Sequence, residues 1–197
     1  LTTLVADAIL QGTAALVTHD AELASRVSTD DARLNGVRFS IEETTYAMLE
    51  SHLLKEREVR LLVSMVMVSQ ALEQIGDNAA NVAHLALRLI RNQQSGMPQN
   101  FKDELSEMAH TAAEMTNNAV RAFVEGDARL AESTVRRDRE LNEAYERLIG
   151  EGTQSQPAEW RLLLQWVAHN LQQIGTYAGT ICERAIFVAT GEIKEFR

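Results

Sequence analysis

Residues 71–86, ALEQIGDNAANVAHLA, recur in the second half of the chain as residues 170–185, NLQQIGTYAGTICERA, with six of the sixteen positions identical. A second pair of segments repeats in the same order. Residues 20–35, DAELASRVSTDDARLN, match residues 127–142, DARLAESTVRRDRELN, at seven of sixteen positions. Segments that recur in a fixed order indicate one supersecondary unit built twice. The sequence therefore predicts two structurally similar halves.

Each half has the composition and periodicity of long helices. The 197 residues include only 2 prolines and 10 glycines, and aromatic residues make up 5% of the chain. Apolar residues at helical spacing and few breakers are typical of all-α proteins. We expect six long antiparallel helices, at about residues 1–18, 20–50, 59–91, 101–125, 127–149 and 157–190.

The predicted fold is all-α, with two tandem and similar three-helix bundles. The polar stretch NQQSGMPQN, which contains Gly96 and Pro98, divides the repeats. We assign residues 1–92 to the first repeat, 93–100 to a linker and 101–197 to the second repeat. Asp20 and Asp127 each stand directly before a helix, and we expect both to be N-caps.

The charge and the single cysteine exclude several classes of function. The formal net charge is −9 and the pI is about 5.1, whereas a domain that grips phosphate backbones is normally basic, so we expect no nucleic-acid partner. No stretch is long and apolar enough to cross a bilayer. Cys182, the only cysteine, lies in an apolar helical context and predicts a buried, inert thiol.

The third expected helix of the first repeat carries a polar stripe. Glu73 and Asp77 are four residues apart on one face, and Asn81 follows on the same face. Two carboxylates at this spacing repel unless a cation lies between them. Hard oxygen ligands favour magnesium, manganese or iron. Asp31, on the preceding helix, could approach and add a further oxygen ligand.

A solvated helix face is the alternative interpretation of this stripe, since most charged faces bind nothing. In the second repeat Gln172 and Thr176 replace the two carboxylates, so we expect at most one metal site, in the first repeat. We also predict that the chain is not an enzyme, because it lacks nucleophile motifs and glycine-rich phosphate loops. A carboxylate-bridged metal oxidase would need paired Glu-x-x-His ligands from two helices, and the sequence contains no such pair.

The same segments resemble the PhoU family. Residues 72–83, LEQIGDNAANVA, resemble the family's Leu-Glu-Arg-Ile-Gly-Asp-x-Ala-x-Asn-Ile-Ala pattern. The elements DAELA…DARLN and DARLA…DRELN match its Asp-x-x-Leu-Ala element, which is followed by an Asp and Asn pair. Residues 181–192, ICERAIFVATGE, are similar to its ending. The resemblance covers essentially the whole chain and implies two three-helix repeats.

The resemblance also implies a function and a site. In that family the Glu-x-x-x-Asp positions bind metal clusters, which here falls on Glu73 and Asp77, with Asn81 as a neighbour and Asp31 further away. The family implies a non-enzymatic cytoplasmic regulator of phosphate uptake and phosphate-starvation signalling. Such a regulator is an adaptor between a phosphate ABC transporter and a sensor histidine kinase, associated with the membrane through these partners.

Three further expectations follow. A homodimer is plausible because helix faces are exposed. The chain could instead be the cytoplasmic PhoU-like domain of a sodium/phosphate cotransporter. It could also be a helical scaffold without metal.

Overall fold

The computed structural model describes residues 1–197 except residues 30, 52, 92–96, 151–157 and 197; the side chains of residues 29, 31–34, 51 and 159 also lie outside the described part. The described residues form helices with no strand, as the sequence predicts. The helices of the first half are α1 (Thr2–Thr18), α2 (Ala21–Thr29), α3 (Asp31–Ser51) and α4 (Glu56–Arg91). Those of the second half are α5 (Gln99–Glu125), α6 (Ala128–Val135), α7 (Asp138–Ile149) and α8 (Ala158–Thr190).

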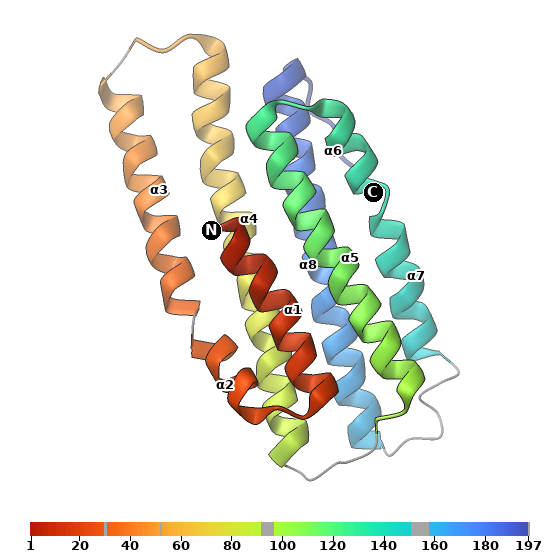
Figure 1. Ribbon diagram of the computed structural model, residues 1–197. Coiled ribbons are helices and arrows are strands. Elements are labelled where there is room, and N and C mark those ends of the chain that lie inside the picture. The colour runs from red at the N-terminus through yellow and green to blue at the C-terminus, as the bar shows by residue number, and fades with distance from the viewer. Residues whose placement is uncertain (30, 52, 92–96, 151–157, 197) are drawn as a thin grey trace.

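The two long helices α4 and α8 pack against each other at the centre of the molecule (Figure 1). Helices α1, α2 and α3 pack on α4, while α5, α6 and α7 pack on α8. A second contact between the halves is made by α1 and α5. Ile75 on α4 and Ile174 on α8 occupy equivalent positions in the repeats, and both are fully buried. The fold is thus two similar helical bundles joined along their central helices.

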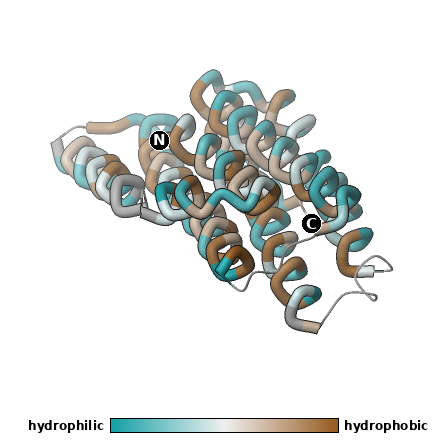
Figure 2. The backbone as a smooth tube through the Cα atoms, turned by 60° about the horizontal axis from the view of Figure 1, so that its bottom comes forward, coloured by the Kyte–Doolittle hydropathy of each residue, from teal (hydrophilic) through white to brown (hydrophobic). Residues whose placement is uncertain are grey.

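Hydrophobic and hydrophilic residues alternate along the helices (Figure 2). The apolar positions of both halves form one continuous core that includes Leu16, Leu72, Met115 and Leu171. Helices of marginal intrinsic stability are held mainly by such packing of an amphipathic face. No helix among the described residues is sufficiently long and apolar to span a membrane.

The middle helix of the second repeat is divided in two, so the prediction of one continuous helix there is wrong, whereas in the first repeat residue 30, between α2 and α3, lies outside the described residues. In the first repeat α2 ends at Thr29 and α3 begins at Asp31; in the second, α6 ends at Val135 and α7 begins at Asp138. A serine hydroxyl bonds to a backbone carbonyl near the end of both α2 and α6. Ser28 Oγ donates to the Ser25 carbonyl, and Ser133 Oγ donates to the Leu130 carbonyl, both at 2.9 Å.

The turns before α2 and α6 are built in the same way in both repeats. His19 and Gly126 adopt left-handed backbone conformations, with φ of 59° and 68°. The next residue is an aspartate whose Oδ1 accepts a backbone N–H: Leu23 donates to Asp20 at 2.9 Å, and Leu130 donates to Asp127 at 3.0 Å. The two predicted N-caps are confirmed.

The start of α5 differs from the sequence expectation. Gln99 and Asn100, which the sequence assigns to the linker, already belong to α5, and Pro98 stands at its N-cap. Proline suits this position because its fixed φ and missing N–H are tolerated at a helix start. Residues 92–96 of the linker region lie outside the described residues.

The single cysteine is buried in α8, as the sequence predicts. Burial raises the pKa of the Cys182 thiol to about 12, with a smaller contribution from the nearby Glu183 carboxylate. A thiol with such a high pKa is protonated at neutral pH and is therefore a poor nucleophile.

Candidate functional site

The polar stripe of α4 lies partly against neighbouring helices. Glu73 and Asp77 are half-buried, whereas Asn81 is exposed. The side chain of Asp31 lies outside the described residues. The structure therefore places three of the four predicted ligands on α4 and says nothing of where the Asp31 carboxylate points.

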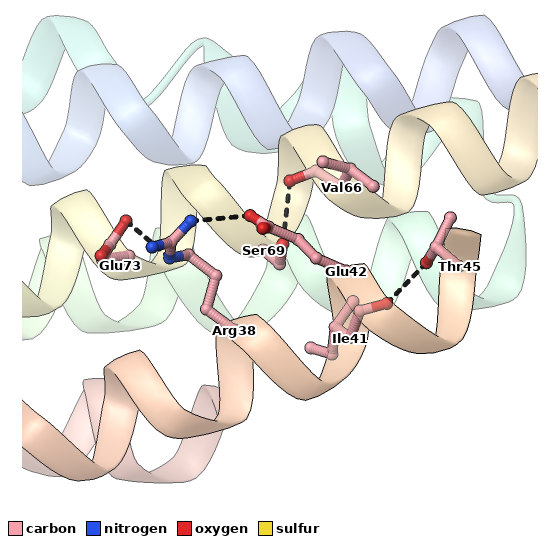
Figure 3. Close-up of polar contacts among 7 residues, drawn as sticks. All are labelled: Arg38, Ile41, Glu42, Thr45, Val66, Ser69 and Glu73. Carbon is pink, nitrogen blue, oxygen red and sulfur yellow. Dashed lines mark hydrogen bonds and ion pairs between the residues drawn. The ribbon is translucent and has the colours of Figure 1, made fainter. Parts of the chain in front are cut away.

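An arginine that the sequence analysis did not single out neutralises Glu73. Arg38 Nε, on α3, forms an ion pair with Glu73 Oε2 at 3.0 Å, and Arg38 Nη1 donates to Glu42 Oε1 at 2.7 Å (Figure 3). The three side chains are 19%, 16% and 22% exposed, respectively. In the low dielectric between two helices a paired carboxylate of this kind is held firmly. Arg38, Glu42 and Glu73 are called the Arg38 cluster below.

Gln74 connects Asp77 with the other half of the molecule. Gln74 Nε2 donates to Asp77 Oδ2 at 3.5 Å, and Tyr177 O–H, on α8, donates to Gln74 Oε1 at 3.4 Å. These long contacts make a polar bridge across the interface of the central helices. Glu73 is thus paired with α3, whereas Asp77 bonds to Gln74 within α4, and Gln74 in turn reaches α8.

The described side chains do not by themselves make a metal site. Among them, no three His, Cys, Asp or Glu residues lie close enough together to hold a metal ion. The guanidinium of Arg38 places a positive charge directly on Glu73, where a bound cation would be repelled. The described groups therefore fit an internal ion pair better than a resident metal. With Asp31 undescribed, the metal site stays a prediction.

The equivalent position in the second repeat is a neutral amide network beside one carboxyl group. Gln172 Nε2, on α8, donates to Asn142 Oδ1 at 2.7 Å, and Asn142 Nδ2 donates to Asp138 Oδ2 at 3.0 Å. The other oxygen of Asp138 is buried without a hydrogen-bond partner. Burial raises the pKa of the Asp138 carboxyl, although the hydrogen bond from Asn142 opposes this.

Sequence reasoning identified the residues of α4 but missed their partners. Arg38 and Glu42 are four residues apart, and this spacing is a readable signal for a pair on one helix face. The contact between Arg38 and Glu73 joins separate helices, and no local pattern contains it. The contact between Tyr177 and Gln74 also joins separate helices and is not contained in a local pattern.

The architecture and the polar face define a class of proteins: all-α chains made of two tandem three-helix repeats that pack along their last helices. The PhoU domain family model matches residues 1–86 and 105–185, which lie in the two repeats. The chain belongs to the PhoU family.

Individual relatives agree with this assignment. The chain is 27% identical over 201 residues to the phosphate-specific transport system accessory protein PhoU homolog 1 of Thermotoga maritima, covering 98% of this chain and 84% of the relative. The crystal structure of PhoU from Pseudomonas aeruginosa superposes with a TM-score of 0.88 and 26% identity, covering 97% of this chain and 92% of that one. The phosphate transport system regulatory protein PhoU from Streptococcus pneumoniae has the same fold, with a TM-score of 0.87.

Proposed function

We propose that this chain is a non-enzymatic accessory protein of phosphate transport that regulates phosphate uptake. The observation that carries the proposal is the family match, which extends over both repeats, together with relatives named as accessory proteins of phosphate-specific transport systems. The finer role is that of an adaptor, which contacts a phosphate ABC transporter and a sensor histidine kinase from the cytoplasmic side. This role requires contact surfaces and no catalytic residues.

An exposed apolar surface on the first repeat supports a role in protein contact. In Figure 1, α1 runs beside the second half of α4, and the first half of α4 packs with α3. This part of the molecule exposes large hydrophobic side chains, which we call the α3/α4 face: Phe39, Tyr46, Met48, Val59, Leu61, Val63 and Met67. Large exposed apolar side chains such as these are typical of protein-binding surfaces.

Deletion of the gene tests the proposed function. We expect phosphate-starvation genes to be expressed at high phosphate in the deletion strain, and wild-type protein to restore repression. A variant of the α3/α4 face, Val63→Glu with Met67→Glu, is expected to fold but to fail in restoring repression. The matched control is Val124→Glu, at an exposed apolar position on α5. Unchanged starvation-gene expression in the deletion strain contradicts the function, and full rescue by the double variant contradicts the role of this face.

Metal binding is a separate hypothesis. Iron, manganese or magnesium at Glu73 and Asp77 of the first repeat, with Asp31 and Asn81 nearby, would have to compete with Arg38 for Glu73. Elemental analysis of the wild type and of a Glu73→Ala, Asp77→Ala variant, each loaded with these metals, tests this. Metal that the double substitution removes supports a metal-tuned adaptor. Equal metal content in both proteins is evidence against a site on these carboxylates.

A further inference from the structure

A small pocket opens on the second repeat between α7 and α8. Its volume is about 320 Å³, and it is lined by Tyr145, Leu162, Gln165, Trp166 and His169. Three of these five side chains are aromatic rings in contact. The centroids of Tyr145 and His169 lie 6.3 Å apart, and those of Trp166 and His169 lie 6.2 Å apart in an edge-to-face arrangement. Trp166 is 52% exposed, so its ring is accessible from solvent.

Aligning the two repeats shows which residues of the first repeat correspond to those around this pocket. Helices α3 and α7 begin at the aligned residues Asp31 and Asp138, so Tyr145 stands where the first repeat has Arg38. On the central helices, Trp166 and Gln172 stand where α4 has Met67 and Glu73.

In the first repeat the space between the middle and the last helix holds the guanidinium of Arg38. Figure 3 shows this group above α4, reaching from Glu73 toward Glu42. In the second repeat the arginine is replaced by an aromatic residue and the glutamate by an amide. Tyr145, in place of Arg38, lines an open aromatic pocket, whereas Gln172, in place of Glu73, lies outside the pocket lining and bonds to Asn142.

We propose that this pocket binds the guanidinium of an arginine presented by a partner protein. Guanidinium groups stack on the faces of tryptophan and tyrosine and are attracted by their negative π surfaces. Gln165 adds an amide oxygen that can accept a guanidinium N–H. The net charge of −9 favours the approach of a cationic segment. A free amino acid fits less well, because the net negative charge of the chain disfavours its carboxylate.

This inference goes beyond the proposed role in phosphate uptake and does not depend on it. A short peptide tests the pocket in purified protein, where the phosphate response plays no part. A negative result with the peptide would not contradict the proposed regulatory function. A negative result in the deletion strain would not contradict binding in the pocket.

The probe is the capped tripeptide acetyl-Gly-Arg-Gly-amide, titrated to about 50 mM, because one side chain is expected to bind with millimolar affinity. Two-dimensional NMR of isotope-labelled protein follows the indole N–H of Trp166, with buried Trp160 as the internal reference. We expect a saturable shift at Trp166 and none at Trp160. The citrulline peptide, which keeps the shape but lacks the charge, is expected to bind about five-fold more weakly.

Two variants and two further ligands complete the test. Tyr145→Arg with Gln172→Glu recreates the internal ion pair of the first repeat and is expected to abolish binding. Met67→Leu, at the position of the first repeat equivalent to Trp166, is expected to leave binding unchanged. The lysine peptide is expected to bind more weakly than the arginine peptide, because an ammonium cannot stack as a plane. Free L-arginine is expected to bind no more tightly than the capped peptide.

Several results would overturn the proposal. They are the absence of a shift at Trp166 at the highest concentration, equal affinity for the arginine and citrulline peptides, and unchanged binding by the Tyr145→Arg, Gln172→Glu variant. Tighter binding of free L-arginine than of the capped peptide would assign the pocket to a small molecule and reject the partner protein. Circular dichroism of each variant confirms that a loss of binding does not reflect a loss of fold.

Discussion

Removing Arg38 is expected to destabilise the first repeat, and the magnitude follows from the burial of its ion pairs. Exposed ion pairs contribute about 0–1 kcal/mol, and breaking a fully buried pair costs about 3–5 kcal/mol. Arg38 and Glu73 are 19% and 16% exposed and lie between these limits. We therefore expect Arg38→Met to lower the free energy of unfolding by about 2 kcal/mol. In a chain of this length that corresponds to a fall in Tm of about 4–8 °C.

A double-mutant cycle separates the ion pair from the loss of packing. The cycle uses Arg38→Met, Glu73→Gln and the double variant, unfolded by urea at constant salt. We expect a coupling energy of about 1–2 kcal/mol. Unfolding should be followed by far-ultraviolet circular dichroism, because both tryptophans lie on α8 and their fluorescence reports the second repeat.

The matched control is the pair formed by Arg139 and Glu143 on α7. These residues are four apart on one helix, at 2.9 Å, and are 84% and 54% exposed, so they show what a solvent-exposed pair contributes. A pair so exposed is expected to show a coupling of about 0.3–0.5 kcal/mol. If the coupling between Arg38 and Glu73 were no larger than this control, the argument that the Arg38 cluster replaces an external cation at Glu73 would be refuted.

Three further substitutions test the second repeat. Asp138→Asn is expected to raise stability at pH 7. Burial raises the pKa of the Asp138 carboxyl above its ordinary 3.8, so the stability of the wild type falls as pH rises through that raised pKa. Urea unfolding from pH 4 to 7 should therefore show this fall in the wild type, and the variant should lack it. Gly175→Ala should cost more than about 1 kcal/mol in thermal unfolding, because a Cβ there would overlap Leu141 Cδ1 and lie 2.9 Å from Asp138 Oδ1; an unchanged Tm would contradict this packing. Asp127→Ala should cost about 1 kcal/mol by removing the N-cap of α6, and a loss below a few tenths would show that the cap is dispensable.

The features predicted correctly from the sequence are those encoded locally. Asp20 and Asp127 are short acceptors directly before apolar helical patterns, and such caps are visible in a single sequence. The repeated segments indicated two similar halves, because a repeat is a property of the sequence itself. The interruption after Val135 was missed because the period of apolar residues alone cannot detect two residues that leave the helix.

The partners of the polar stripe could not be predicted in this way. The contact of Glu73 with Arg38 depends on how α3 lies on α4, and neither residue carries a local signal for it. Glu73 and Asp77 lie on one helix face, as the spacing requires, yet Glu73 pairs with Arg38 on α3, whereas Asp77 bonds to Gln74 on its own helix. Spacing on one helix fixes which side chains share a face, whereas the neighbouring helices decide what those side chains bind.

Comparison of the two repeats explains why arginine and glutamate are present together in one and absent together in the other. Glu73 without Arg38 would be a half-buried carboxylate without its partner, and Arg38 without Glu73 would retain only Glu42. Leaving one charge of a buried pair unmatched costs more than removing both. The second repeat has lost both, with Tyr145 and Gln172 in their places, and Gln172 bonds to Asn142 instead. Because both charges are absent from the second repeat, neither is left there without its partner, and Tyr145, in place of Arg38, forms part of the aromatic pocket beside Trp166.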